Sequence, residues 1–277
     1  MSQPKPVPDH GHPMMGVDNY SPSDIADLVQ SRGVAKAKAS LLDTLVLSIL
    51  AGAFVALGAV FATAVGSQST LGFGLTRLLM GVSFSLGLVL VIVAGAELFT
   101  GNNLIVMAWA DGKITLAAML RNWLLVYAGN FAGAVATTVI VHWSGILALD
   151  GGAVGETAVA IAKAKVALPF TEAFFRAVLC NTLVCLAVWL CFAAHTVAGK
   201  ILAIIPPISA FVALGFEHSV ANMYFIPMAM LADGDGLTMA GFVGNLIPVT
   251  LGNIIGGSVF VTLIYWIIYI RRPDSRS

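Results

Sequence analysis

The stretch NWLLVYAGNFAGA at residues 122–134 returns 123 positions later as NLIPVTLGNIIGG, at residues 245–257. Each copy contains an asparagine followed by GNxxG, and the same offset places Trp143 opposite Trp266. A register kept over this length indicates an internal repeat. Each copy ends a group of three apolar spans, so the second group enters the membrane upside down. The chain is predicted to consist of two inverted three-helix repeats.

The composition places this chain in a membrane. It is 58% hydrophobic and 10% charged, with a mean hydropathy of +0.93, whereas a soluble domain carries about 25% charged residues. Apolar runs long enough to cross a hydrocarbon core of about 30 Å lie at 41–65, 78–109, 116–143, 170–194, 201–232 and 241–270. We therefore expect an all-α membrane protein with six transmembrane helices. Its zero net charge gives no basic surface for nucleic acid.

The segments outside the spans set the domain limits. Residues 1–40 are polar and lack an apolar core before a cleavage site, which favours a solvated N-terminal arm over a signal peptide. Residues 41–272 form one six-span channel domain, with repeats at about 41–143 and 170–270, and 273–277 form a tail. Ten lysines and arginines lie on the side of the N-terminus and four on the other. This bias predicts that both termini, and hence the arm and the tail, are cytoplasmic.

A second echo marks where two spans are interrupted. GAELFTGNNLIVMA from Gly95 and GFEHSVANMYFIPMA from Gly215 both place a glycine, a glutamate and a polar break inside apolar sequence. As one straight helix, the second span would be ~48 Å long, more than the core needs. Helices two and five are therefore predicted to be broken near the midplane, where transporters of this design bind substrate. We expect Glu97 and Glu217 to satisfy backbone groups freed by the breaks.

His218 is the histidine placed well inside a span. An ionisable side chain there is a functional-site hypothesis by default, and imidazole titrates near neutral pH. Thr100, Asn181 and Asn222 can add neutral hydrogen bonds to a passing solute, or each can bond between helices. The three cysteines share one span without disulfide or metal spacing, so they are assigned to packing. No metal or other cofactor is expected.

Five blocks carry a resemblance to a known family: GAELFTGNN, NWLLVYAGNFAGA, CNTLVCLAVW, GFEHSVANMYFIPM and NLIPVTLGNIIGG. Together they resemble the signature blocks of the formate/nitrite transporter family and run through most of 41–272. The resemblance implies an aquaporin-like protomer, not an enzyme, with one substrate path in each subunit of a homopentamer. It also implies a location in the bacterial cytoplasmic membrane.

The resemblance assigns roles residue by residue. It implies that His218 is the central histidine, that Asn181 and Asn222 lie beside the substrate path, and that Thr100 lies on the loop breaking helix two. It implies that Phe84 and Phe211 form an outer constriction and that Leu88 and Leu98 form an inner one. It also implies that Lys165 is a lysine of the outer vestibule. The arm matches no block, so no gating by it is implied.

The implied function is passage of small monovalent anions of weak acids, with proton assistance. An apolar constriction disfavours the charged form, because desolvation raises the pKa of the acid. Formate is favoured, because LFTGNNLIVMAWADGKIT and CNTLVCLAVW look closer to formate members; nitrite and hydrosulfide stay open. A neutral-solute channel is disfavoured because no twin NPA motif lies at the breaks. A membrane-embedded enzyme or metal protein would need a second set of buried ligands beside His218.

Overall fold

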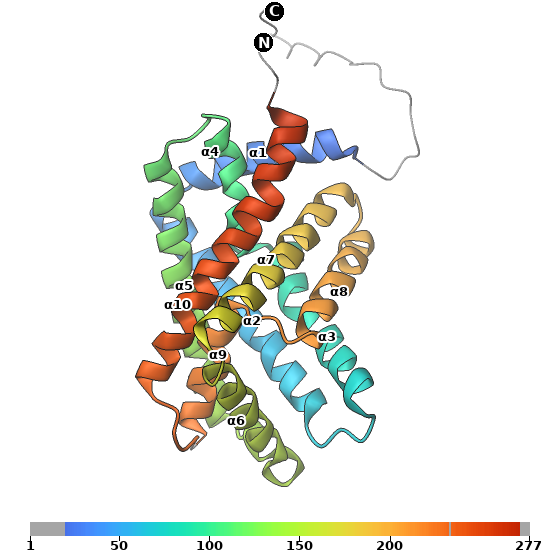
Figure 1. Cartoon of the computed structure of the whole chain (residues 1–277), viewed down its shortest axis with the longest axis vertical. Coiled ribbons are helices and arrows are strands. Elements are labelled where there is room, and N and C mark those ends of the chain that lie inside the picture. Colours follow the sequence, from blue (N-terminus) through green and yellow to red (C-terminus); the bar gives the residue numbers. More distant parts are fainter. Residues whose placement is uncertain (1–19, 233, 272–277) are drawn as a thin grey trace, which may run out of the picture.

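The computed structural model describes residues 20–232 and 234–271 and is a bundle of helices (Figure 1). Within these residues, five helices are long and apolar enough to cross a membrane: α2 (Leu41–Gly66), α3 with η1 (Phe73–Gly95), α5 (Leu116–Trp143), α7 (Phe170–Ala193) and α10 with η4 and η5 (Met239–Ile270). A sixth crossing consists of two shorter apolar helices, α8 (Val197–Ala213) and α9 (Ser219–Leu231). The predicted all-α architecture with six spans is confirmed.

Both predicted breaks are present. α3 (Phe73–Val89) continues into the π-helix η1 (Leu90–Gly95), and the chain then runs irregularly before the 3-10 helix η2 (Gly101–Ile105) and α4 (Val106–Ala110). In the other half, α8 ends at Ala213 and α9 starts at Ser219. The repeat-related Gly95 and Gly215 have φ of +87° and +71°, which glycine adopts without steric cost. The two spans therefore break at corresponding positions.

Glycines from the repeated GNxxG motif let helices of each half approach closely. A Cβ on Gly133 of α5 would collide with the carbonyl oxygen of Ile49 on α2. A Cβ on Gly256, where α10 (Met239–Ile255) passes into η4 (Gly256–Leu263), would collide with the carbonyl oxygen of Val178 on α7. Small residues of this kind allow tight packing between transmembrane helices. The inverted repeat is thus reproduced in the packing.

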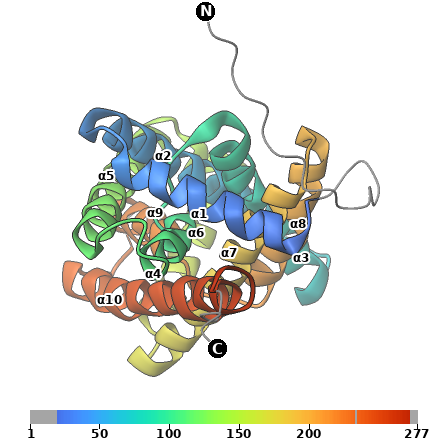
Figure 2. The same ribbon diagram turned by 90° about the horizontal axis from the view of Figure 1, so that it is seen from above.

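A further helix lies at each end of the bundle. α1 (Pro22–Lys38) crosses one end, and α6 (Ala153–Val166), which follows η3 (Ile146–Gly152), lies at the other (Figures 1 and 2). We refer to these ends as the α1 side and the α6 side. The remaining element, η5 (Trp266–Ile270), ends the last crossing on the α1 side.

α1 occupies part of the segment expected to be a solvated arm. A capping box between Ser21 and Asp24 starts the helix, and Ile25, Ala26 and Val29 are buried. The helix is polar on average, but its apolar side chains share one face, which packs on the bundle. Residues 22–38 are therefore part of the folded domain. The rest of the predicted arm, 1–19, and the predicted tail, 273–277, lie outside the described residues.

Candidate functional site

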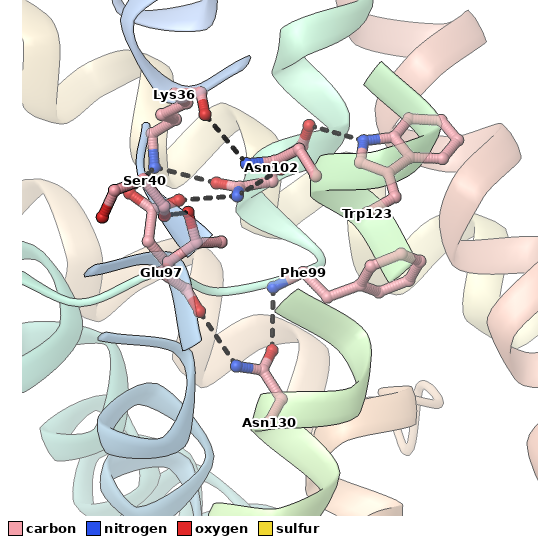
Figure 3. Close-up of polar contacts among 9 residues, drawn as sticks. Lys36, Ser40, Glu97, Phe99, Asn102, Trp123 and Asn130 are labelled. Atoms are coloured by element: carbon pink, nitrogen blue, oxygen red, sulfur yellow. Dashed lines mark hydrogen bonds and ion pairs between the residues drawn. The ribbon is translucent and has the colours of Figure 1, made fainter. Parts of the chain in front are cut away.

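One asparagine side chain holds the break in the first half. Asn130 of α5 accepts a hydrogen bond from the Phe99 backbone N–H at 2.9 Å (Figure 3). Its amide nitrogen donates to the carbonyls of Glu97 at 2.9 Å and Ser48 at 2.7 Å. The side chain is fully buried. It therefore replaces, inside the membrane, hydrogen bonds that the interrupted helix cannot make.

The second half uses the matching asparagine in the same way. Asn253 accepts from the Ser219 backbone N–H at 2.9 Å and donates to the carbonyls of Glu217 at 3.0 Å and Ala177 at 2.9 Å. Asn130 and Asn253 are partners in the sequence repeat. The repeat thus preserves the residue that stabilises each broken helix.

The glutamates do not have the role that the sequence predicts for them. The carboxylates of Glu97 and Glu217 bond lysine and asparagine side chains, while Asn130 and Asn253 serve the backbone. A carboxylate only accepts hydrogen bonds, whereas an amide both accepts and donates. The amide therefore satisfies the N–H and carbonyl groups of a break together.

In the first half, Glu97 belongs to a charged network on the α1 side (Figure 3). The Lys36 ammonium of α1 lies 2.8 Å from a Glu97 carboxylate oxygen. Asn102 donates to the other Glu97 oxygen at 2.7 Å and to the side-chain oxygen of Asn122 at 3.0 Å. Asn122 then donates to the Lys36 carbonyl at 3.2 Å. The four residues close a ring around the break.

The second half repeats this ring on the α6 side. The Lys165 ammonium of α6 lies 2.9 Å from a Glu217 oxygen, and Asn222 donates to the other oxygen at 2.7 Å. Asn222 also donates to Asn245 at 2.7 Å, and Asn245 donates to the Lys165 carbonyl at 2.9 Å. Each half therefore pairs its own carboxylate with a lysine from the helix at its own end of the bundle.

The two rings differ at the lysine. Lys36 also donates to the side-chain oxygen of Asn102 at 2.8 Å. The equivalent oxygen of Asn222 is buried and has no partner among the described residues. The Lys165 ammonium lies 5.4 Å from the centre of the Phe225 ring. Lys165 thus keeps more of its donor capacity for another group than Lys36 does.

His218 links the two breaks. Its Nδ1 accepts a hydrogen bond from the Ala221 backbone N–H at 3.1 Å, which caps α9. A backbone N–H can only donate, so Nδ1 carries no proton and the neutral ring has its proton on Nε2. Nε2 lies 2.9 Å from the Thr100 hydroxyl oxygen and donates to it. A second proton on Nδ1 would displace the Ala221 N–H from its acceptor.

A small cavity of about 10 Å³ lies beside His218. Its wall is otherwise apolar and consists of Val55, Phe84, Leu88, Leu98, Val184, Ile208 and Phe211. The Phe84 and Phe211 rings meet edge to face at 5.5 Å between centroids. The cavity therefore combines a hydrogen-bonded imidazole with hydrocarbon walls, a setting in which an ion is far less stable than a neutral molecule.

Larger cavities lie on either side of this one. The cavity on the α6 side, about 70 Å³, is lined by Phe84 and Phe211 together with Lys165, Arg77 and His218. The cavity on the α1 side, about 60 Å³, is lined by Leu88, Leu98, Arg32, Lys36 and Asn102, among others. Cations thus border both outer cavities, and apolar side chains separate each from the central one.

The structure brings most of the predicted site residues together. Thr100 and His218 are in contact, and Lys165 shares a cavity wall with His218. Asn181 and Asn222 are instead fully buried behind this wall. Asn181 donates to the carbonyls of Thr100 at 3.2 Å and Asn253 at 2.7 Å and to the Asn103 side chain. Asn181 thus ties the first break to α10 of the second half.

Sequence reasoning missed Lys36 and Arg77. Lys36 was only counted among the charges of the N-terminal segment. Arg77 follows no motif. It lines the α6-side cavity and donates to two carbonyls at the end of α8.

Several known proteins are similar to this chain. Residues 23–267 match the family described as formate/nitrite transporter. The chain is 40% identical to the formate channel FocA of Escherichia coli K12, covering 93% of this chain and 97% of the relative. It is 42% identical to a probable formate transporter of Methanothermobacter thermautotrophicus, covering 93% and 100%. A solved pentameric formate channel with formate bound has 40% identity and a TM-score of 0.78, covering 83% and 98%.

Proposed function

The chain belongs to the formate/nitrite transporter family, and from this premise we propose that it conducts formate, one path per protomer of a homopentamer. The family is one of transporters, so the enzyme alternative falls. Relatives named as formate channels, and a solved relative described as pentameric with formate bound, support the choice of anion and assembly.

The observation that carries the proposal is the order of the three cavities. The central cavity beside His218 lies between two apolar constrictions. Beyond each constriction lies a cavity lined by cations. The Phe84–Phe211 pair is the constriction toward the α6 side, and the Leu88–Leu98 pair is the one toward the α1 side. Cations at both mouths concentrate a monovalent anion, and the constrictions reject its charge.

Passage then requires neutralisation of the anion. Removal of water from a carboxylate disfavours its charged form, so formate takes up a proton that the bulk solution delivers through the cavity water as it enters the constriction. Formic acid is small and neutral, and it passes His218, which bonds Thr100, between the two constrictions. Because Thr100 accepts from His218 Nε2, its own hydroxyl hydrogen is available for an oxygen of the substrate.

The orientation follows from charge. We propose that the α1 side is cytoplasmic, because ten lysines and arginines lie on the side of the N-terminus and four on the other. The Lys165 cavity then faces outward and receives formate from outside a bacterial cytoplasmic membrane.

Uptake by proteoliposomes tests the function. Labelled formate, nitrite and hydrosulfide are offered separately to the purified protein at several external pH values. We expect formate to enter fastest and its entry to accelerate as the external pH falls. Nitrite or hydrosulfide entering faster than formate would reassign the substrate within the family. Passage of glycerol without passage of any of the three anions would overturn the proposal.

A further inference from the structure

Arg77 of α3 holds the end of α8. Its Nε donates to the Ala213 carbonyl at 3.1 Å, and Nη2 donates to the Val212 carbonyl at 2.8 Å. The last carbonyls of a helix have no partner within the helix, and their negative dipole favours a cation. α3 and α8 lie side by side (Figures 1 and 2). Arg77 therefore joins two neighbouring half-helices at their α6-side ends.

These half-helices carry the two rings of one constriction. Phe84 lies seven positions after Arg77 on α3, about two helical turns away. Phe211 directly precedes Val212 on α8. The ring contact between Phe84 and Phe211 thus depends on how closely the end of α8 is held to α3.

The loop that leads to His218 also passes the guanidinium. Gly215 has φ of +71°, and a Cβ built there would lie 3.0 Å from Arg77 Nη2. Glu217 follows, with its backbone N–H directed to the Arg176 carbonyl at 3.4 Å. Arg77 is therefore bonded at the start of the five-residue connection, Leu214 to His218, that positions the imidazole.

Comparison of the two breaks shows that, among the described residues, Arg77 serves the second half and has no counterpart in the first. The bond from the Phe216 N–H to the Phe211 carbonyl has its twin in the bond from Ala96 to Val91, at 3.0 and 2.9 Å. In that first half, no side chain in the described part of the chain donates to the carbonyls of Ile92 or Val93. A device required only to end the helix would be needed in both halves.

We propose that Arg77 is a positioning residue that keeps the Phe84–Phe211 constriction closed to charged anions. It does so by fastening the end of α8, and with it Phe211 and the approach to His218, to α3. The identity of the transported acid rests on the proposed function. The exclusion of strong-acid anions by the constriction can be tested without it. Loss of the two bonds should raise chloride leakage, because the rings can then separate and admit water.

The experiment compares Arg77→Met and Arg77→Lys with the parent, reconstituted as the full chain in lipid bilayers and vesicles. Methionine keeps length and removes both donors, while lysine keeps the charge and one flexible donor. Arg176→Met is the matched control: Arg176 Nη1 lies beside the same glycine, but among the described residues the side chain bonds only Glu172, at 3.2 Å. Chloride conductance, the KM for formate and its maximal rate are measured together.

We expect Arg77→Met to raise chloride conductance by about tenfold or more, as loss of charge-assisted hydrogen bonds implies. Arg77→Lys should recover part of the tightness, and Arg176→Met should stay as tight as the parent. A higher KM for formate without chloride leakage in Arg77→Met would mean that Arg77 only attracts the anion by its charge, and this result would overturn the proposal. If Arg77→Met does not assemble, a chloride-tight Arg77→Lys with parental kinetics would contradict it as well. Absence of formate uptake in the parent would overturn the proposed substrate, whereas the chloride comparison would still decide the role of Arg77.

Discussion

The Thr100 hydroxyl and His218 Nε2 lie 2.9 Å apart and connect the broken second span to the broken fifth. Thr100 comes from the loop that precedes η2, and His218 is the N-cap of α9. His218 is thus both the cap of a half-helix and the polar group at the central cavity. These two roles can be separated by substitution.

His218→Asn should fold and assemble like the parent but lose most acid-stimulated formate uptake. Asparagine caps a helix well and keeps an acceptor for the Ala221 N–H, yet it has no titratable ring to reach Thr100. His218→Phe should lose uptake and also about 1 kcal/mol of stability, because the cap is gone. Thermal denaturation and uptake across pH check both, and undiminished acid-stimulated uptake in His218→Asn would remove the imidazole from the mechanism.

Lys165→Met should destabilise the protein more than Lys36→Met. The side chains of the Lys165–Glu217 pair are 14% and 4% exposed, against 31% and 16% for Lys36–Glu97. Removal of one partner from a buried pair leaves an unpaired charge, at a cost of about 3–5 kcal/mol. Unfolding of the purified oligomer measures the difference. Adding Glu217→Gln to Lys165→Met should restore part of the loss; no recovery would show that the lysine acts through something other than this carboxylate.

Asn130→Ala and Asn253→Ala should each lower the unfolding free energy, by about 1–3 kcal/mol for every backbone group left unsatisfied. The two sites lie in different halves and share no partner, so their effects should add to within about 0.5 kcal/mol in the double variant. Unfolding of the single and double variants tests this. Losses no larger than those of a lipid-facing control, Leu124→Ala, would mean that the breaks do not depend on these amides.

Phe84→Ala combined with Phe211→Ala should let chloride through. Removal of both rings from the α6-side constriction admits water and lowers the desolvation cost that now rejects ions. Formate uptake by the double variant should depend less on pH than uptake by the parent. Chloride conductance in bilayers is the measurement, with Phe170→Ala as an exposed aromatic control. A folded double variant that stays chloride-tight would show that these rings do not line the path.

The repeat made the architecture predictable from sequence. The shared GNxxG frame and the paired glutamates locate both breaks, because an inverted duplication repeats every structural requirement. The prediction that Glu97 and Glu217 satisfy the backbone at the breaks was wrong, because the sequence cannot show that Asn130 and Asn253 already do so. Those asparagines were visible in the repeat but indistinguishable from packing residues.

Other features depend on contacts between residues far apart in the sequence, which no local sequence pattern indicates. Lys36 meets a glutamate 61 positions away, and Arg77 meets carbonyls 135 and 136 positions away. α1 escaped prediction because its apolar face is narrow and its average is polar. The contact between Thr100 and His218 joins the halves across 118 positions. Their types suggested function, but only the fold brings them within bonding distance.

The closed rings around the two breaks bear on how the protein is made. Lys36, Glu97, Asn102 and Asn122 are all synthesised before any residue of the second half leaves the ribosome, and Asn130 follows within the same helix. The first half can therefore enter the bilayer with its carboxylate already neutralised and its interrupted backbone already bonded. What waits for the second half is the carbonyl and hydroxyl of Thr100, which Asn181 and His218 reach. Each half thus contains every member of its own ion-paired ring, whereas the contact between Thr100 and His218 requires both halves.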